Sequence, residues 1–304
     1  MTNWLRQAVV GLSLLLLVLG IYLLRLNRIA GQMVDDAWYI LLARSLAEGH
    51  GYRMISSAVE PILPLYPPGW PAVLSVVFHV SPGFPDNVLL LKTVSIAAMI
   101  GVGFLTFVYL RTHRQIPGPI AGTAAVGTAI VPAFVFLATS TLMSECVFTV
   151  AQLAAVVLAH RAVESTRDRR GILLVMTAAA VAVAVLVRSA AAGLFVAIVL
   201  WLIKEGLWKH AVLFVAAVLV CLSPWLIYAR ANAPTTQQRL EHGGAVVYSY
   251  GEQFWMRWAG GPAAGRVTAS DIPARVATNL TDVFARGMGG GKTSRSASAR
   301  PTGG

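Results

Sequence analysis

Charged residues are scarce in this sequence: Asp, Glu, Lys and Arg make up only 12% of its 304 residues, whereas 57% are hydrophobic. An ordinary soluble domain has about 25% charged residues, so the composition excludes that class. Several apolar runs reach the roughly 20 residues that cross a bilayer as a helix. The sequence therefore predicts an all-α, polytopic membrane protein.

Cysteine is almost absent. Cys146 and Cys221 both lie inside apolar runs, and neither has a partner at metal-ligand spacing. The pair therefore carries no information about the redox compartment, and Cys-based metal motifs are excluded. We expect two unreactive thiols and assign no metal ligand.

Acidic residues are also few, 13 against 24 basic ones, which gives a net charge of +11. The basic residues lie in short loops between apolar runs and in about the last 20 residues, not on one face, so nucleic acid is not an expected partner. The anionic headgroups of the lipid bilayer are the expected counterions.

The apolar runs predict about seven transmembrane helices within a domain covering residues 1–230. They cover residues 8–26, 86–110, 120–138, 142–160, 172–187, 190–203 and 210–228. The first run is too long for a signal-peptide core and stays as a span. A single helix over the fifth and sixth would be roughly 48 Å long, more than a core of about 30 Å, so we expect a hairpin around Arg188.

Basic residues in short loops mark the cytoplasmic side of a membrane protein. Here they are Arg111, Arg114, Arg161, Arg167, Arg169, Arg170, Lys204 and Lys209, all in even-numbered connections. The N-terminus is therefore predicted on the cytoplasmic side of the cell membrane, and the long first connection, residues 27–85, on the outer side. With the even-numbered connections inside, the odd-numbered ones lie outside. Asp35, Asp36, Glu145 and Arg188 then all lie at the outer face, where one site can contain them.

Within this first connection we expect two interfacial helices separated by an ordered loop. Tyr39, Leu42, Ala43 and Leu46 recur at helical spacing after Asp35 and Asp36, one of which should be the N-cap, and Gly49 should end the helix. Four prolines between residues 51 and 71 forbid a regular helix there. Residues 72–80 form a second apolar piece, too short to span.

After the last span the composition becomes polar. Residues 231–286 are predicted to be an external segment with aromatic residues that rest on the membrane interface. These are Tyr248, Tyr250, Trp255 and Trp258. Residues 287–304 contain almost nothing to bury and are predicted to be a disordered tail.

The first connection carries several motifs in a defined order. They are Asp35-Asp36-x-x-Tyr39, then Ala43-x-x-Leu46-x-x-Gly49-x-Gly51-Tyr52, then Tyr66-Pro67-Pro68-Gly69-x-Pro71, with Ser144-Glu145 following at the start of the fourth span. This order resembles polyprenyl-phosphate-dependent membrane glycosyltransferases of the cell envelope, of the protein O-mannosyltransferase, lipid A aminoarabinose transferase and lipopolysaccharide galacturonate transferase type. Their multi-span fold is called GT-C, and the resemblance covers residues 8–230.

The resemblance implies that Asp35 is the catalytic base of an inverting transfer and that Asp36 is the acid beside it. The donor would be a polyprenyl-phosphate-linked sugar, and the acceptor a hydroxyl of a lipid, glycan or protein. Because the phosphate is already a good leaving group, the enzyme mainly deprotonates the acceptor and orients both substrates. Alternatively, the two Asp residues only cap the helix, each contributing ~1 kcal/mol.

Glu145 resembles a second acidic residue of this family, which orients the acceptor or joins the Asp pair around a divalent cation. No cofactor is assigned, and Mg²⁺ or Mn²⁺ stays open; water contact at the interface is the alternative for Glu145. Arg188 resembles the arginine that would hold the lipid phosphate, with snorkelling to the interface as its alternative.

Four residues of the first connection are further candidates for binding substrate. They are Tyr39, which belongs to the first motif, and His50, Arg53 and Tyr66, which are chosen by position alone. A residue at such a position is more often a solvated loop residue, which is the alternative for each of the last three.

The chain departs from the family in two respects. The aminoarabinose transferases carry a Lys in the segment corresponding to Tyr66-Pro67-Pro68, and this chain has none. Relatives also continue for several more spans, whereas the apolar pattern here stops near Tyr228, which predicts a form that is short at the C-terminus.

Other functional classes explain less of the sequence. A transporter or lipid-linked sugar flippase would show charged residues near span centres or internal repeats, and neither is visible. A truncated, inactive scaffold accounts for the short C-terminus but for none of the loop motifs. Gly291-Lys292-Thr293 resembles the end of a phosphate-binding loop, but Arg286 stands where that loop needs its first glycine.

Overall fold

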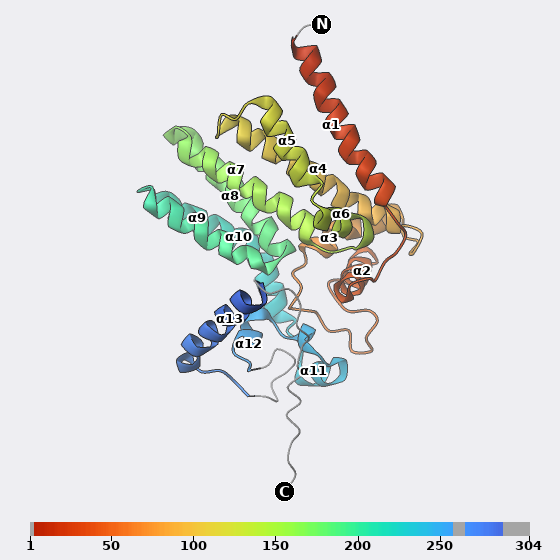
Figure 1. Ribbon diagram of the computed structural model, residues 1–304. Helices are drawn as coiled ribbons and strands as arrows, with labels where there is room; N and C mark the ends of the chain where they lie inside the picture. Colours follow the sequence, from red (N-terminus) through yellow and green to blue (C-terminus); the bar gives the residue numbers. More distant parts are fainter. Residues whose placement is uncertain (1–2, 258–264, 288–304) are drawn as a thin grey trace. The chain divides into compact units, whose positions relative to one another are not determined.

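The computed structural model describes residues 3–257 and 265–287 (Figure 1). In these ranges it is all-α and has no β-strand, apart from one isolated bridge between Met256 and Arg266. The chain divides into two compact units, Met1–Tyr248 and Ser249–Gly304, which are described separately.

The first unit contains the helices that could cross a membrane. Its α-helices are α1 (Asn3–Arg25), α2 (Val34–Ala47), α3 (Gly69–Val80), α4 (Val88–Thr112), α5 (Gly118–Ala129), α6 (Pro132–Ser140), α7 (Glu145–Glu164), α8 (Arg167–Val187), α9 (Ala192–Lys204), α10 (Trp208–Ala231) and α11 (Thr236–His242), with 3₁₀ turns at Ser189–Ala191 and Ala245–Val247. In the second unit the 3₁₀ turn Ala269–Asp271 leads into α13 (Ile272–Gly287), and α12 (Tyr250–Phe254) precedes them.

Each of the seven apolar runs is helical, but not each is long enough to be a span. Among the described residues, four helices can cross a membrane by length and composition, α4, α7, α8 and α10, and α5 with α6 makes a fifth if this pair, bent by 49°, is one span. The apolar part of α1 (Val9–Arg25) and the segment Ser189–Lys204 are shorter. The expectation of about seven spans is therefore met only in part: the break at Arg188 leaves the segment Ser189–Lys204 short, and Pro132 starts a new helix within the run 120–138.

The break expected around Arg188 is present. Arg188 ends α8 with extended backbone (φ −154°, ψ 121°), and α9 follows after one 3₁₀ turn. One hydrophobic cluster contains Leu174 near the start of α8 and Leu202 near the end of α9. The chain therefore doubles back at Arg188, as the hairpin prediction required.

The predicted N-cap of α2 was wrong. Met33 is the N-cap residue, and Asp35 and Asp36 occupy the second and third helical positions. Asp36 nevertheless caps the helix from inside, because its Oδ2 accepts the backbone N–H of Met33 at 3.3 Å. Gly49 follows the helix with φ +82°, in the left-handed region that favours glycine, so the predicted end was correct.

The proline-containing segment between α2 and α3 is ordered and has no regular helix, as predicted. Its apolar side chains Tyr52, Met54, Ile62 and Leu63 are buried in a cluster that also includes residues of α2 and α3. Helix α3 then approaches α8 closely: a Cβ at Gly69 would lie 2.6 Å from the carbonyl carbon and oxygen of Leu186. Only glycine fits there, so the Pro-Gly motif sets how α3 packs against the residues preceding Arg188.

In the second unit the guanidinium of Arg275 donates to the backbone carbonyl of Phe254 at 2.6 Å, which joins α13 to α12. Tyr250 and Trp255 are 55% and 40% exposed, and their contact with the membrane interface stays a prediction. Trp258 and the tail predicted to be disordered, apart from Gly287, lie outside the described residues.

Candidate functional site

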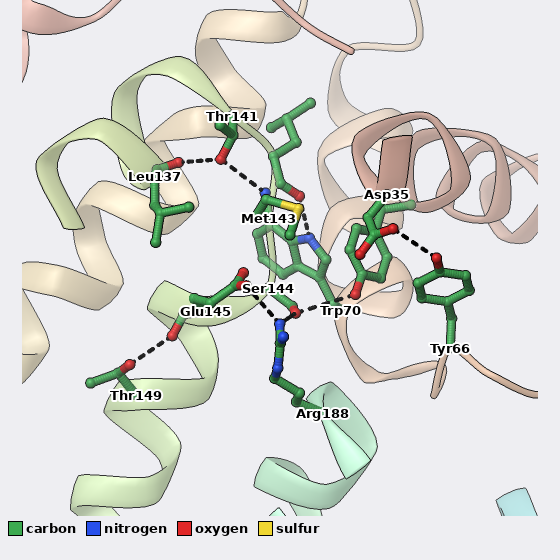
Figure 2. A network of polar contacts seen from close by, with 12 residues as sticks. Asp35, Tyr66, Trp70, Leu137, Thr141, Met143, Ser144, Glu145, Thr149 and Arg188 are labelled. Atoms are coloured by element: carbon green, nitrogen blue, oxygen red, sulfur yellow. Dashed lines mark hydrogen bonds and ion pairs between the residues drawn. The ribbon is translucent and has the colours of Figure 1, made fainter. Parts of the chain in front are cut away.

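Residues far apart in the sequence form one polar network in the first unit (Figure 2). Asp35 comes from α2, Tyr66 from the loop before α3, Ser144 and Glu145 from the start of α7, and Arg188 from the end of α8. Five of the eight predicted site residues, Tyr39 included, therefore meet at one place.

Asp35 is half-buried, and its Oδ1 accepts a hydrogen bond from the Tyr66 hydroxyl at 2.7 Å (Figure 2). Asp35 is thus held by a neutral donor and stays partly accessible, which is the environment that a general base needs.

Tyr39 connects Asp35 and Tyr66 with the start of α7. Its ring lies edge-on to that of Tyr66, with centroids 5.4 Å apart, and its hydroxyl is 3.2 Å from Ser144 Oγ. Burial raises the pKa of Tyr39 to about 12, so the phenol stays protonated and neutral at physiological pH.

Arg188 forms the charged end of the network. Its Nη1 donates to Glu145 Oε1 at 2.7 Å and to Ser144 Oγ at 3.3 Å. The two charged side chains are 37% and 25% exposed, respectively. The other carboxylate oxygen of Glu145, Oε2, is buried and has no hydrogen-bond partner, which is unusual for an ionisable group. A substrate hydroxyl or a cation would satisfy it.

Asp36 is completely buried and has a different role from Asp35. Its Oδ1 accepts the backbone N–H of Leu142 at 2.9 Å, while the indole of Trp70 donates to the carbonyl of the same residue at 2.7 Å. The motifs that contain Asp36 and Trp70 thereby hold both backbone polar groups of Leu142, just before Ser144 and Glu145. Asp36 is a positioning residue in this structure.

Burial raises the pKa of Asp36 above its ordinary value, and the charge of Asp35 adds to this effect. The two backbone N–H groups and the positive charge of Lys92 oppose the rise. Both oxygens of Asp36 already accept backbone N–H groups, so it is poorly placed to hold the Mg²⁺ or Mn²⁺ left open above. The oxygens of Asp35 and Glu145 are the better ligands for such an ion.

His50 and Arg53 make their contacts elsewhere. His50 lies 3.9 Å from Glu48, with 56% of its side chain exposed, and Arg53 donates to the side chain of Asn232 at 3.4 Å. The structure therefore does not join these two candidates to the network around Asp35.

Sequence reasoning missed Trp70 and Lys92. Trp70 is the unspecified residue of the Pro-Gly-x-Pro motif, so its indole carried no signal of its own. Lys92 was hidden within an apolar run. It is fully buried, and its Nζ donates to the carbonyls of Asn27, Ile29 and Thr139 at 2.9, 2.6 and 2.9 Å. A lone Lys near the end of an apolar span was the available signal.

Comparisons of the chain with models of protein families, with curated proteins and with solved structures found no match.

Proposed function

We propose that this protein is an integral membrane glycosyltransferase that moves a sugar from a polyprenyl-phosphate carrier to an acceptor hydroxyl. The proposal rests on the motif resemblance and on one observation: Asp35, half-exposed and hydrogen-bonded to Tyr66, belongs to the same network as Arg188. A base for the acceptor and a cation for the phosphate are thereby combined in one place.

In the proposed reaction Asp35 takes the proton of the acceptor hydroxyl. The hydroxyl oxygen then forms a bond to the anomeric carbon, and the bond from that carbon to the phosphate oxygen breaks. The electron pair leaves with the polyprenyl phosphate. Because this is a single displacement, the anomeric configuration inverts. No general acid is required, unlike in glycoside hydrolysis, because phosphate leaves without protonation.

Arg188 stabilises the leaving phosphate in this mechanism. Its contacts with Ser144 and Glu145 both use Nη1, so we expect Nη2 and Nε to bind the phosphate oxygens. Glu145 orients the guanidinium. In this mechanism its Oε2 accepts a hydrogen bond from a substrate hydroxyl or coordinates a cation. Tyr66 holds Asp35, and Tyr39 contacts both the Tyr66 ring and Ser144 in the middle of the network.

The proposal includes an active site on the outer face, with α2 and α3 lying in the interface and the N-terminus in the cytoplasm. Neither a transporter nor a scaffold gains support from an observation. Lys92, the charged side chain in the first two turns of α4, is held by backbone carbonyls, which is a structural role.

The test compares Asn and Ala at Asp35 in the purified protein. Asn keeps the shape and accepts the Tyr66 hydrogen bond but cannot take a proton, so Asp35→Asn should lower sugar transfer by ~10²-fold or more. Transfer is measured with a panel of synthetic polyprenyl-phosphate hexoses and pentoses, with thermal stability recorded in parallel. Full activity of the Asn variant, or activity that follows stability in both variants, contradicts Asp35 as the base.

A further inference from the structure

A second cluster of polar side chains lies at the opposite end of α7. His160 and Glu164 are one helical turn apart on this helix, and His113 is the residue that ends α4. One ligand atom from each of the three lies within 4.8 Å of the other two. Among the residues that the structure describes, this is the group of His, Cys, Asp and Glu that could hold a metal ion.

The distances in the cluster are close to those of a metal site. His113 Nδ1 lies 2.7 Å from Glu164 Oε2, and His160 Nε2 lies 3.5 Å from Glu164 Oε1. In a tetrahedral zinc site with bonds of about 2.0–2.1 Å, neighbouring ligand atoms are about 3.3–3.4 Å apart. The two distances bracket this value, so small rotations of the side chains suffice to bind an ion.

His113 is the buried member of the cluster. Its side chain is only 4% exposed, and Nδ1 is the nitrogen that faces Glu164. Burial within the packed helices fixes the direction of this nitrogen, so His113 offers a ligand atom that is already oriented towards the carboxylate.

The helix itself makes an isolated Glu164 unfavourable. The C-terminal end of a helix carries a partial negative charge, so a carboxylate in the last turn is repelled there. The two imidazoles lie close together, with ring centroids 4.7 Å apart. A divalent cation bound between them and Glu164 would neutralise the carboxylate and the partial charge of the helix end.

We propose that His113, His160 and Glu164 bind a divalent first-row transition ion of the Zn²⁺ class, which fastens the end of α4 to the end of α7. Two imidazoles and one carboxylate suit such an ion better than Mg²⁺ or Ca²⁺, which prefer oxygen ligands alone. The fourth position of a tetrahedral ion is then filled by water, which can reach the site because the Glu164 side chain is 54% exposed.

The surroundings limit the affinity without blocking the site. The rings of Tyr109 and Trp201 lie 5.6 and 5.2 Å from that of His160 and restrict its rotation. The guanidinium of Arg114 rests on Tyr109 at 5.8 Å, and its positive charge opposes that of the ion. Replacing Arg114 by Gln should therefore strengthen binding of the ion.

The test measures metal binding directly and does not involve transferase activity. The full chain is purified in detergent without a polyhistidine tag, and Zn²⁺ is quantified by equilibrium dialysis and elemental analysis. We expect one ion per chain, and Co²⁺ in its place should give the visible absorption of a four-coordinate site. His113→Ala and Glu164→Gln should each weaken binding at least 10-fold, and Zn²⁺ should raise the melting temperature of the wild type but not of Glu164→Gln.

The matched control is His79→Ala, which removes an exposed histidine in the last turn of α3 and should bind Zn²⁺ like the wild type. Glu164→Gln keeps the size and hydrogen bonding of Glu164, so that variant should fold even if His113→Ala does not. Equal binding by Glu164→Gln and the control, or no stoichiometric ion in the wild type, overturns the proposal.

Discussion

Helix α7 carries a glutamate at each of its ends, and the two carboxylates have different surroundings. Glu145, in the first turn, lies at an end where the helix favours negative charge, and it pairs with Arg188 at 2.7 Å. Glu164, in the last turn, lies where the helix disfavours negative charge, and it faces two imidazoles. In a sequence both are acids at the edge of an apolar run. Their partners come from other helices, and those partners set what each can do.

The comparison extends to the way that each end is held. At the first end, Asp36 and Trp70 fix the backbone of Leu142, and Gly69 brings α3 against α8, so the charged groups stand on a rigid support. At the last end, the side chains contact one another directly and the C-cap of α4 supplies His113. The first arrangement suits the orientation of a substrate, and the second suits a small ion that draws its ligands together.

The largest expected contrast concerns the sides of the membrane. The exposed residues Ser56 and Thr166 belong to the connections expected outside and inside, respectively. With Cys221, the exposed native thiol, replaced by Ala, Ser56→Cys should react with an impermeant thiol reagent in intact cells, and Thr166→Cys only after lysis. Labelling in the reverse order would place the Glu145 end of α7 inside and remove the proposed external site.

The next effect should come from Gly69. An added methyl group would overlap the backbone of Leu186 and cannot be relieved by moving a side chain. Gly69→Ala should therefore lower the free energy of unfolding by about 2–4 kcal/mol and disturb Arg188, which follows two residues later. Gly193→Ala is the control, because nothing lies within 4 Å of a Cβ there. Thermal unfolding of both variants in detergent measures the difference, and equal melting temperatures would show that α3 does not pack as described.

Removing the guanidinium of Arg188, at the first end of α7, should affect stability less than it affects the binding of polyprenyl phosphate. Arg188→Ala leaves Glu145 partly buried without its partner, at a cost of about 1–2 kcal/mol after allowance for exposure. If Arg188 holds the donor phosphate, the affinity for a polyprenyl phosphate should fall ~10-fold or more. Arg188→Lys keeps the charge but not the bidentate geometry and should recover only part of it. Unchanged affinity in Arg188→Ala would assign Arg188 to snorkelling.

The smallest effect should come from Asp36→Asn. The amide oxygen of Asn can still accept the N–H of Leu142, but its amide nitrogen cannot accept the N–H of Met33. We expect the free energy of unfolding to fall by about 1 kcal/mol at neutral pH. Sugar transfer should fall only in proportion to the folded fraction. A loss of transfer as large as in Asp35→Asn, without a loss of stability, would show that Asp36 takes part in the chemistry.

The pH dependence of that variant sharpens the distinction. Because the pKa of Asp36 is raised in the folded protein, folding favours its protonated form. The resulting stabilisation is fully present below the unfolded pKa of about 3.9 and is lost as the pH rises through the folded value. Asn has no such titration, so the difference in melting temperature between variant and wild type should change over this acidic range and be constant at higher pH.

The sequence by itself determined which segments are helical, that the chain breaks at Arg188 and which short motifs carry polar groups. Apolar runs, prolines and glycines specify these features locally, through backbone geometry and the need to satisfy peptide groups, and so the break at Arg188 and the ordered loop before α3 could be predicted. The count of seven spans is not confirmed: among the described residues four helices, or five with the bent pair α5 and α6, are long and apolar enough.

The tertiary structure decided what each polar residue contacts. Asp35 and Asp36 are identical side chains on adjacent positions, but successive residues of a helix point about 100° apart. One carboxylate therefore meets the Tyr66 hydroxyl near the surface, and the other meets the buried N–H of Leu142, about 106 residues away in sequence. Likewise, His113 comes within hydrogen-bonding distance of Glu164 only because α4 packs against α7. Such contacts depend on how distant segments pack together, which no local pattern encodes.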